Sequence, residues 1–370
     1  MSTSVGLYGA SGTAYVLQQA VSTLTDQQTA LVAQATTGVV SDTYAGLGDQ
    51  RGQALSLQPQ ITAISTWQTS ISGAQTNLSV TQSALTEITS LNTTLQNDLL
   101  SLNGTYGKET LATVAASAQT ALSELGDYLN AQGSTGYVFA GTDVNNAPVT
   151  DAGGLANSTL ATVTSDVVSQ LDTLGASSVL ETATSYASSG ATYTSADGTT
   201  VNLSVFSSAL STDPSSAKGL ETKAVVGQSS VINVGMVATE GTTPTSSQTT
   251  TTGSAIRDLM RNLMIVASLG SADTSSSNFS DLVTQLKAST NTVGTELSNQ
   301  EGTLGLMQSS LTTQSTNLST MSTMLTSQLS DIKDVDIAAV SVQTGNVQDQ
   351  LMASYTLISD LKGMTLASYI

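Results

Sequence analysis

The chain has no cysteine and no histidine among its 370 residues, and only one tryptophan. Without cysteine it can form neither disulfides nor thiolate metal sites, and thiol catalysis is excluded. Histidine is the commonest general base and metal ligand, so its absence argues against most enzyme classes. Catalysis by this chain would have to use carboxylates or lysine. We therefore expect a protein that is not an enzyme and that holds no cofactor or metal.

Basic residues are scarce, because nine lysines and arginines stand against 27 acidic residues, for a net charge of -18. A surface of this sign repels phosphate backbones, so we expect no nucleic-acid partner. Charged residues nevertheless make up only 10% of the chain. Serine, threonine, glutamine and asparagine supply the remaining polarity, and such side chains allow close contact between copies of the same chain.

Long apolar runs are also missing. No stretch approaches the roughly 20 residues that a membrane-spanning helix needs, so we expect no membrane insertion. The first residues, MSTSVGLYGASGTAYVLQQA, lack the basic start and the continuous apolar core of a secretory signal peptide. The sequence predicts either a cytoplasmic protein or one exported by a route that reads another signal.

Apolar residues near the N-terminus recur at helical spacing. They predict one amphipathic helix of about 25 residues that ends at Thr37 and Gly38. Its stripe steps by four and three residues through Leu17, Val21, Leu24, Gln28, Leu31 and Ala35.

A longer helix follows. We expect it to begin near Pro59, because proline suits a first helical turn, and to end at Asn103 and Gly104. One position repeats every seven residues, at Ile64, Ile71, Leu78, Leu85, Asn92 and Leu99. The polar Asn92 in this ladder either fixes the helix register or faces a neighbouring loop. A third helix is predicted at about 109–131.

The C-terminal part repeats this pattern. A second sevenfold ladder runs through Leu297, Leu304, Leu311, Leu318, Leu325 and Ile332. A final helix carries Val347, Leu351, Tyr355, Ile358 and Leu361 on one face, and apolar residues continue to the last position. Since neither chain end can bury its stripe alone, the helices of the two ends should pack together.

The middle of the chain has a different composition. Glycine, threonine and β-type runs predict strands at 136–142, 199–206 and 223–238, whereas 155–185 fits either a helix or irregular structure. A helix resumes at 255–269. We therefore predict a mainly α protein, in which both chain ends form a long antiparallel coiled-coil bundle around a central β-containing insert.

Two short motifs suggest binding sites but fit them poorly. The stretch GLGDQRG (46–52) has Arg51 where a dinucleotide fingerprint needs its third glycine, and no strand precedes it, so we interpret it as a turn. In DVNNAPVTDAGG (143–154), Ala147 interrupts the calcium-loop pattern of Asp143 and Asn145, which favours a plain loop.

Carboxylates are the remaining candidates for acid–base residues. Three aspartates around Lys333 have no partner base and are interpreted as a solvated joint between helices; they are Asp331, Asp334 and Asp336. An enzyme acting on carbohydrate would need paired carboxylates in the insert. The candidates there are Asp151, Asp166, Asp197 and Asp213, and their spacing indicates no pair.

Four stretches resemble the flagellin superfamily. Residues 27–58 resemble its N-terminal segment, and 221–238 resemble the paired strands before the returning helix. Residues 129–149, with GYVFAGT, and 329–370, ending in MTLASYI, resemble the hook–filament junction proteins within that superfamily. The segment that flagellins write as SGxRIN is TGVV here, without its arginine and asparagine.

The resemblance implies a structural component of the bacterial flagellum, a hook-associated protein that joins hook to filament, with filament flagellin itself as the alternative. The implied partners are copies of the same chain in a ring or tube, a neighbouring hook-associated protein, flagellin, and an export chaperone at the C-terminal helix. It also implies export by the flagellar type III system, without a cleaved signal peptide, to the extracellular flagellum.

From these patterns we expect three parts. Residues 1–42 and 336–370 form terminal helical arms used in assembly, 43–145 and 220–335 form the helical bundle with hairpins, and 146–219 form a variable insert domain. The expected subunit interface comprises Leu17, Val21, Leu24, Leu31, Val347, Leu351, Ile358, Leu361 and Met364.

Overall fold

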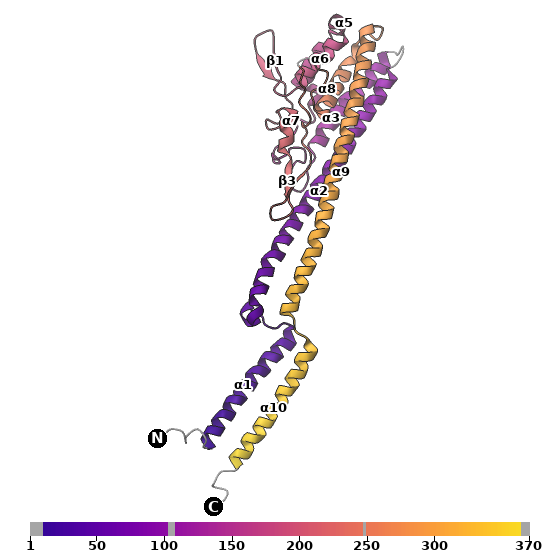
Figure 1. The fold of residues 1–370 in the computed structure, drawn as a ribbon. Helices are drawn as coiled ribbons and strands as arrows, with labels where there is room; N and C mark the ends of the chain where they lie inside the picture. Colours follow the sequence, from indigo (N-terminus) through magenta and orange to yellow (C-terminus); the bar gives the residue numbers. More distant parts are fainter. Residues whose placement is uncertain (1–9, 103–107, 247–248, 364–370) are drawn as a thin grey trace, which may run out of the picture. The chain divides into compact units, whose positions relative to one another are not determined.

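A computed structural model describes residues 10–102, 108–246 and 249–363 (Figure 1). The chain divides into two compact units, one made of the residues up to Ser65 and from Ser319, the other of Thr66–Leu318. Two long helices contribute to both units, α2 (Arg51–Ser101) and α9 (Ser277–Lys333). The expected three-part division remains a prediction.

In the first unit, α1 (Ala10–Thr37) and α10 (Ile337–Gly363) lie side by side (Figure 1). Gly38 ends α1 with a φ of 74°, a conformation that costs glycine little and that commonly closes a helix. A backbone hydrogen bond joins the end of α1 to the start of α10, because the Val335 amide donates to the Gly38 carbonyl at 3.0 Å. Since this joint links the C-terminal end of α1 to the N-terminal end of α10, the two helices are antiparallel.

A small core supports this joint. It contains Leu47 from the 3-10 helix Tyr44–Gln50, Ala54 and Leu57 from the start of α2, and Ile332 from the end of α9. The Val40 amide donates to the Lys333 carbonyl at 2.7 Å, and the Lys333 ammonium lies 5.7 Å from the centre of the Tyr44 ring. Apolar burial and one cation–π contact thus hold the chain where its direction changes.

In the second unit, α2 and α9 run antiparallel. Hydrogen bonds join Gln75 to Thr312, Thr89 to Glu301, and Asn92 to the Thr290 carbonyl, so one residue number falls as the other rises. The expected ladder positions are buried, from Ile71 through Leu99 on α2 and from Leu297 through Leu318 on α9. Asn92 faces α9, with its Nδ2 3.1 Å from the Thr290 oxygen, and therefore does not face a loop.

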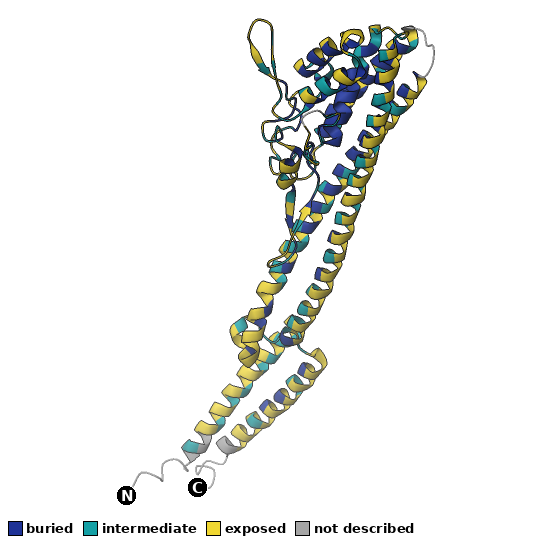
Figure 2. Ribbon diagram, turned by 45° about the horizontal axis from the view of Figure 1, so that its top comes forward, coloured by how far each residue is buried: buried dark blue, intermediate teal, exposed yellow. Residues whose placement is uncertain are grey.

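Two further helices complete the core of this unit, α3 (Lys108–Leu129) and α8 (Ala255–Ser268), which pack against each other. Figure 2 shows α8 as almost entirely buried, including charged residues on its polar side. The polar side is enclosed by α6 (Ala176–Ala187) and the loop before α8, and Arg261 donates hydrogen bonds to the Thr184 hydroxyl on α6 and to the Thr250 carbonyl in the loop. This enclosure explains how a helix with two arginines becomes a core element.

The insert is more helical than the sequence indicates. It contains α4 (Thr159–Val168), α5 (Leu171–Leu174), α6 (Ala176–Ala187) and α7 (Pro214–Ala217), with 3-10 turns at Leu155–Asn157 and Lys218–Leu220. Its strands form two antiparallel hairpins, β1 (Thr192–Thr194) with β2 (Thr200–Asn202), and β3 (Thr222–Val225) with β4 (Val231–Val234). Tyr193 pairs with Val201, and Ala224 pairs with Ile232. A further 3-10 turn, Leu269–Ser271, follows α8 outside the insert.

The mainly α fold class is confirmed, and two local predictions are wrong. Pro59 lies inside α2 rather than in its first turn, because the helix begins eight residues earlier at Arg51. Residues 136–142 form no strand; they make only the isolated bridges of Tyr137 with Gln132 and Ala140 with Val237. Gly136 and Gly141 take positive φ values at the two ends of this stretch and turn the chain there.

Candidate assembly surface

The α1–α10 seam is the line along which the two terminal helices face each other. On α1, residues that are half-buried recur at the expected spacing: Leu17, Val21, Leu24, Gln28, Leu31 and Ala35. On α10, the buried residues are Val340, Val347 and Leu351, which are four or seven positions apart and so share one helix face. The stripe of each helix is therefore covered on one side by the other helix of the same chain.

Most expected interface residues belong to this seam. Val347 is 9% exposed and Leu351 is 6% exposed, whereas the four α1 residues are covered less completely. Ile358 is 36% exposed and is therefore covered less than Val347 and Leu351. Leu361 lies in α10, but its side chain and all of Met364 are outside the described residues. The assignment of these residues to a subunit interface remains a prediction.

A second group of apolar residues, the outer apolar residues, is exposed on these two helices, and only Tyr355 among them belongs to a stripe expected from the sequence. These are Tyr15, Val16 and Val32 on α1, and Ile337, Val342, Met352, Tyr355 and Leu357 on α10. Each is at least 47% exposed. They do not repeat at a single helical spacing, so a search for one stripe overlooks most of them. The signal in the sequence is that apolar residues occur on several sides of one helix.

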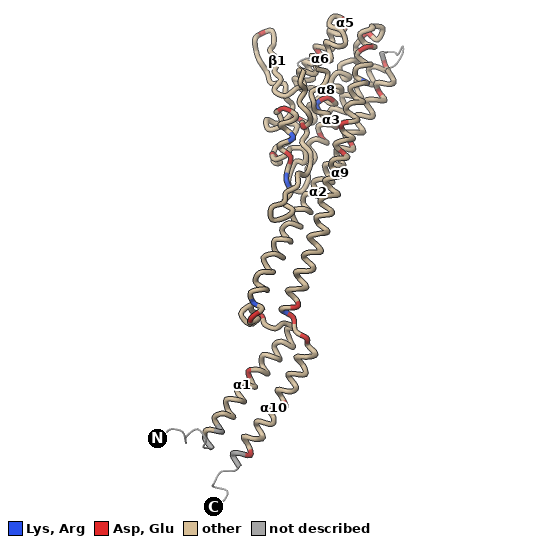
Figure 3. Tube along the Cα trace, viewed as in Figure 1, with Lys and Arg blue, Asp and Glu red and all other residues tan. Residues whose placement is uncertain are grey.

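Charge is nearly absent from both helices, as Figure 3 shows. Within its bounds, α1 carries Asp26 alone, and α10 carries Asp349, Asp360 and Lys362. A further helix could therefore approach this pair with little cost from removing water around ions.

A groove of about 430 Å³ runs along the seam. Uncharged amides line it, from Gln27 and Gln34 on α1 and from Gln343, Asn346 and Gln350 on α10. Amides both donate and accept hydrogen bonds, so this groove can bind the polar side chains of another helix without a charge partner. The seam thus offers apolar and amide contacts side by side.

The three aspartates at the joint next to this surface are exposed. Asp336 accepts hydrogen bonds from the amides of Ala338 and Ala339, at 2.9 and 3.2 Å, and so caps the start of α10. Asp334 accepts a hydrogen bond from the Ser330 hydroxyl. These contacts give the cluster a role in ending one helix and starting the next.

Three of the four candidate carboxylates in the insert accept local hydrogen bonds. Asp151 accepts from the Gly154 amide, Asp197 from the Thr199 amide, and Asp213 from the Ser189 hydroxyl. The Thr199 hydrogen bonds hold the pKa of Asp197 below its usual value. The Asp166 backbone carbonyl accepts bonds within its own helical turn. These contacts are those of loop and helix ends, and none of them joins two of the four carboxylates.

Buried charges in the second unit also have structural partners. Arg261 bonds to Asp258 at 3.1 Å, to the Thr184 hydroxyl at 2.8 Å and to the Ser289 hydroxyl at 2.7 Å. Burial lowers the pKa of Arg261, and the Asp258 charge opposes that shift. Burial likewise lowers the pKa of Arg257 to about 10, against the charges of Asp213 and Asp258. Arg257 therefore stays charged at neutral pH, and the two arginines tie α6 and the neighbouring loops to α8.

The described part of the chain contains neither a helix that could span a membrane nor a cluster of side chains that could hold a metal ion. None of the helices described has the length and apolar content to cross a membrane. Among the same residues, no three acidic side chains come together in a way that would hold a metal ion.

Comparison with known proteins gives one family match over part of the chain. A search of curated proteins finds no significant match. One solved structure, provisionally named a flagellar hook-associated protein from Vibrio parahaemolyticus, is 14% identical, with a TM-score of 0.40, and the alignment covers 76% of this chain and 98% of that one. Residues 288–370, which include most of α9 and all of α10, match the family model of the bacterial flagellin C-terminal helical region. The matched region is thus similar to that family, and α10 lies inside it.

Proposed function

We propose that the chain is a structural subunit of the bacterial flagellum that assembles through its terminal helices. The observation that carries this proposal is the match of residues 288–370 to the flagellin C-terminal region. The same residues include α10, whose outer apolar residues have no cover within the described chain. A structural, non-enzymatic role agrees with the absence of histidine and cysteine from the sequence.

The physical basis of assembly is the burial of the outer apolar residues. Fully burying one such side chain contributes about 1.5–3 kcal/mol. Ordering the helices and losing rotational freedom costs several kcal/mol, so one pair of neighbours gains little. Contacts with neighbours on several sides are then needed, and apolar residues on several sides of α10 supply them. The amide groove on the seam would add polar contacts that fix the register.

Within the flagellum, we assign the chain to the junction between hook and filament. The support is the resemblance of residues 129–149 and of the ending MTLASYI to hook–filament junction proteins, together with the altered TGVV segment. In this role its partners are copies of itself in a ring or tube, a neighbouring hook-associated protein and flagellin. An export chaperone would cover the C-terminal helix before the type III apparatus exports the chain to the cell exterior.

Filament flagellin is the alternative function, and polymer length separates the two. Electron microscopy of the purified chain under assembly conditions should show short rings or no polymer if it is a junction protein. Long filaments formed by this chain alone would establish the flagellin role instead.

A test in cells addresses the junction role directly. Cells that lack this chain should release flagellin monomers into the medium, because the filament has no base on which to grow. Retention of full filaments in such cells would overturn the junction assignment. A chain that never reaches the cell exterior would contradict the flagellar proposal as a whole.

A further inference from the structure

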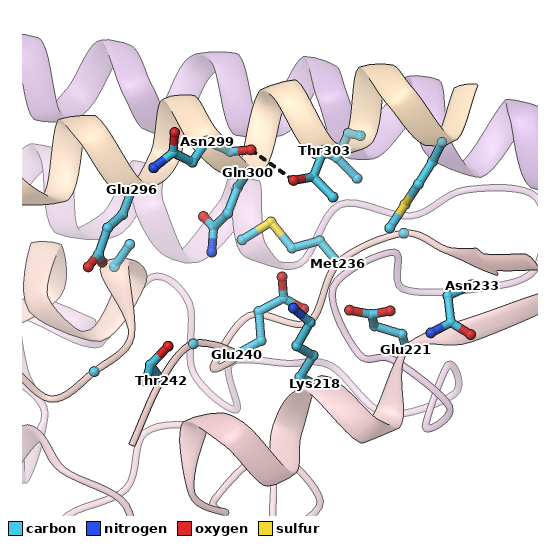
Figure 4. A pocket seen from close by; sticks show the side chains of 16 residues that line it. Lys218, Glu221, Asn233, Met236, Glu240, Thr242, Glu296, Asn299, Gln300 and Thr303 are labelled. Carbon is cyan, nitrogen blue, oxygen red and sulfur yellow. Dashed lines mark hydrogen bonds between the residues drawn. The ribbon is translucent and has the colours of Figure 1, made fainter. Parts of the chain in front are cut away.

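A cavity of about 450 Å³ lies within the second unit, between α9 and the segment that leads from Lys218 through the β3–β4 hairpin to Thr242. Figure 4 shows Glu296 and Gln300 extending from α9 on one side, with Lys218, Glu221 and Glu240 on the other. A cavity of this size lies in the range that holds a small ligand.

Two hydrogen-bond acceptors at this cavity have no donor. Glu221 is only 6% exposed, yet no donor or cation within the described chain bonds to its carboxylate. The Oε1 atom of Gln300 is buried and has no hydrogen-bond partner among the described residues. Leaving a buried acceptor such as Gln300 Oε1 unpaired costs about 1–3 kcal/mol, so this atom favours a bound donor, and the Glu221 carboxylate lines the same cavity.

The net negative charge of the residues that line the cavity also favours a bound cation. Three carboxylates line it, Glu221, Glu240 and Glu296, against one ammonium, Lys218. In the described part of the chain, no salt bridge joins Lys218 to any of these three carboxylates. Glu240 accepts one hydrogen bond, from the Val237 amide at 2.8 Å. Carboxylates therefore outnumber ammonium groups in the lining of the cavity by three to one.

Apolar side chains complete the lining. Met236, which is buried, lies between the two polar walls in Figure 4, and Leu304 and Met307 belong to the same α9 surface. A ligand that suits this site has N–H donors at its ends and methylene groups between them.

We propose that this cavity binds a small organic cation, an alkyl diamine or a guanidinium compound. Its ammonium or guanidinium groups would pair with Glu221 and Glu240 and donate to Gln300, and its methylene groups would lie on Met236. A metal ion fits less well, because no three acidic side chains in the described chain come together at metal-binding positions. The occupant is a free small molecule, and this site is independent of the terminal helices.

Protonation of Glu240 should oppose this binding. Burial raises the pKa of Glu240 to about 7; the Glu221 charge adds to this effect, and Lys218 and the Val237 amide oppose it. On α9, burial also raises the pKa of Glu296, with the charge of Asp258 adding to it. Cation binding favours the ionised carboxylates, so affinity should increase as pH rises through the pKa of Glu240.

The test is isothermal titration calorimetry of the full chain with diaminobutane, at about 150 mM NaCl to screen the general negative charge. Saturable binding is expected, and Glu221→Gln should weaken it by about tenfold or more. Gln300→Met, which removes the acceptor oxygen at similar size, should also weaken it. Asp281→Asn is the matched control, since it removes an exposed carboxylate elsewhere on α9, and it should change affinity by less than about twofold.

Three results would overturn the proposal. The first is the absence of saturable binding up to about 10 mM diaminobutane. The second is equal affinity in wild type and a folded Glu221→Gln variant, as judged by circular dichroism. The third needs no variant: affinity of the wild type that stays constant between about pH 5.5 and pH 8 would exclude a site that contains Glu240. Equal binding of MgCl₂ would assign the heat to a general cation atmosphere instead.

Discussion

At the scale of single residues, Leu311 tests the register of the long bundle. It lies in the middle of the α9 ladder and is fully buried, whereas Ser309, two positions earlier, is exposed. Leu311→Ala should lower the free energy of unfolding by about 2–5 kcal/mol, because it removes buried methyl groups and leaves a cavity. Chemical denaturation measures this change. Ser309→Ala serves as the control and should remain within about 0.5 kcal/mol of wild type.

Glu240 gives the chain a pH dependence of stability. Burial raises the pKa of its carboxyl from an ordinary value of 4.5 to about 7 in the folded protein. Between these two values the folded state binds more protons than the unfolded state, so stability falls as pH rises through this window. The loss reaches at most about 3 kcal/mol above pH 7.

The Glu240→Gln variant isolates this contribution. Glutamine keeps an oxygen for the Val237 amide but cannot ionise, so the variant should lose less stability than wild type between about pH 5 and pH 8. Thermal melts across that range measure the difference. Parallel stability curves for wild type and variant would show that Glu240 ionises freely in the folded chain.

The sequence predicts the burial of an apolar ladder residue such as Leu311 better than the burial of a charged residue such as Glu240. The burial of Leu311 follows from its place in a sevenfold repeat, which is a local property of the chain. The burial of Glu240, Arg257 and Arg261 depends on the folding of the insert around α8, and no local pattern records it. None of these three residues lies in one of the sevenfold repeats, so the sequence does not predict that they are buried.

At the scale of elements, Pro59 tests the continuity of α2. It is the ninth residue of this helix and is exposed, so its missing N–H leaves the Leu55 carbonyl without a helical partner. Pro59→Ala should restore that hydrogen bond and raise the free energy of unfolding by about 1–3 kcal/mol. Denaturant titration measures the change. Destabilisation by this substitution would mean that the proline fixes a bend that the surrounding packing needs.

The terminal helix α10 presents two kinds of apolar residue, and matched substitutions separate them. Val347 is buried in the seam, so Val347→Asp should lower the helical content of the terminal pair in the monomer, since it places an unpaired carboxylate against α1. Tyr355 is 55% exposed, so Tyr355→Asp should leave the melting of the monomer unchanged within about 0.5 kcal/mol. In our proposal it nevertheless abolishes assembly.

Assembly of these variants can be followed by sedimentation and electron microscopy. Tyr355→Phe keeps the ring and serves as the conservative control, which should assemble as wild type does. Normal assembly of the Tyr355→Asp chain would contradict the proposal that the outer apolar residues contact neighbours. A variant that is found inside cells but not in the medium would place the defect in export instead.

The short elements of the insert illustrate a limit of prediction. The β-type runs at 136–142 and 199–206 predict strands, but within these two ranges only Thr200–Asn202 forms a strand. Positive φ values at Gly136 and Gly141 turn the first run, and such turns depend on contacts with distant loops. The 223–238 stretch contains the β3–β4 hairpin, whose two strands are close in sequence and pair locally.

At the scale of the whole molecule, the sequence predicted the fold class well. Two sevenfold ladders, at 64–99 and 297–332, lie far apart along the chain, and each needs a partner to bury its stripe. The structure pairs α2 with α9, and α1 with α10, which follows from that requirement. The division at Ser65 and Ser319 was not foreseen, because the ladders continue through both positions without a break in pattern.

The two units should differ in how often they open. In the first unit, α1 and α10 bury only one side against each other, and their α1 seam residues are half-exposed. In the second unit, α2 and α9 share a core with α3 and α8, and residues such as Leu85 and Leu297 are fully buried. Local opening costs least where few apolar contacts are lost, so the terminal helices should open far more often.

Hydrogen–deuterium exchange on the purified monomer measures this difference. Amides at 15–35 and 340–358 should exchange quickly, whereas those at 71–95 and 290–318 should be protected close to the global free energy of unfolding. Assembly should then slow exchange in 15–35 and 340–358 most, because neighbouring chains cover the outer apolar residues only in the polymer. Equal protection of all four segments in the monomer would show that α1 and α10 are already stable as a pair. The energy of assembly would then come from surfaces other than the terminal helices.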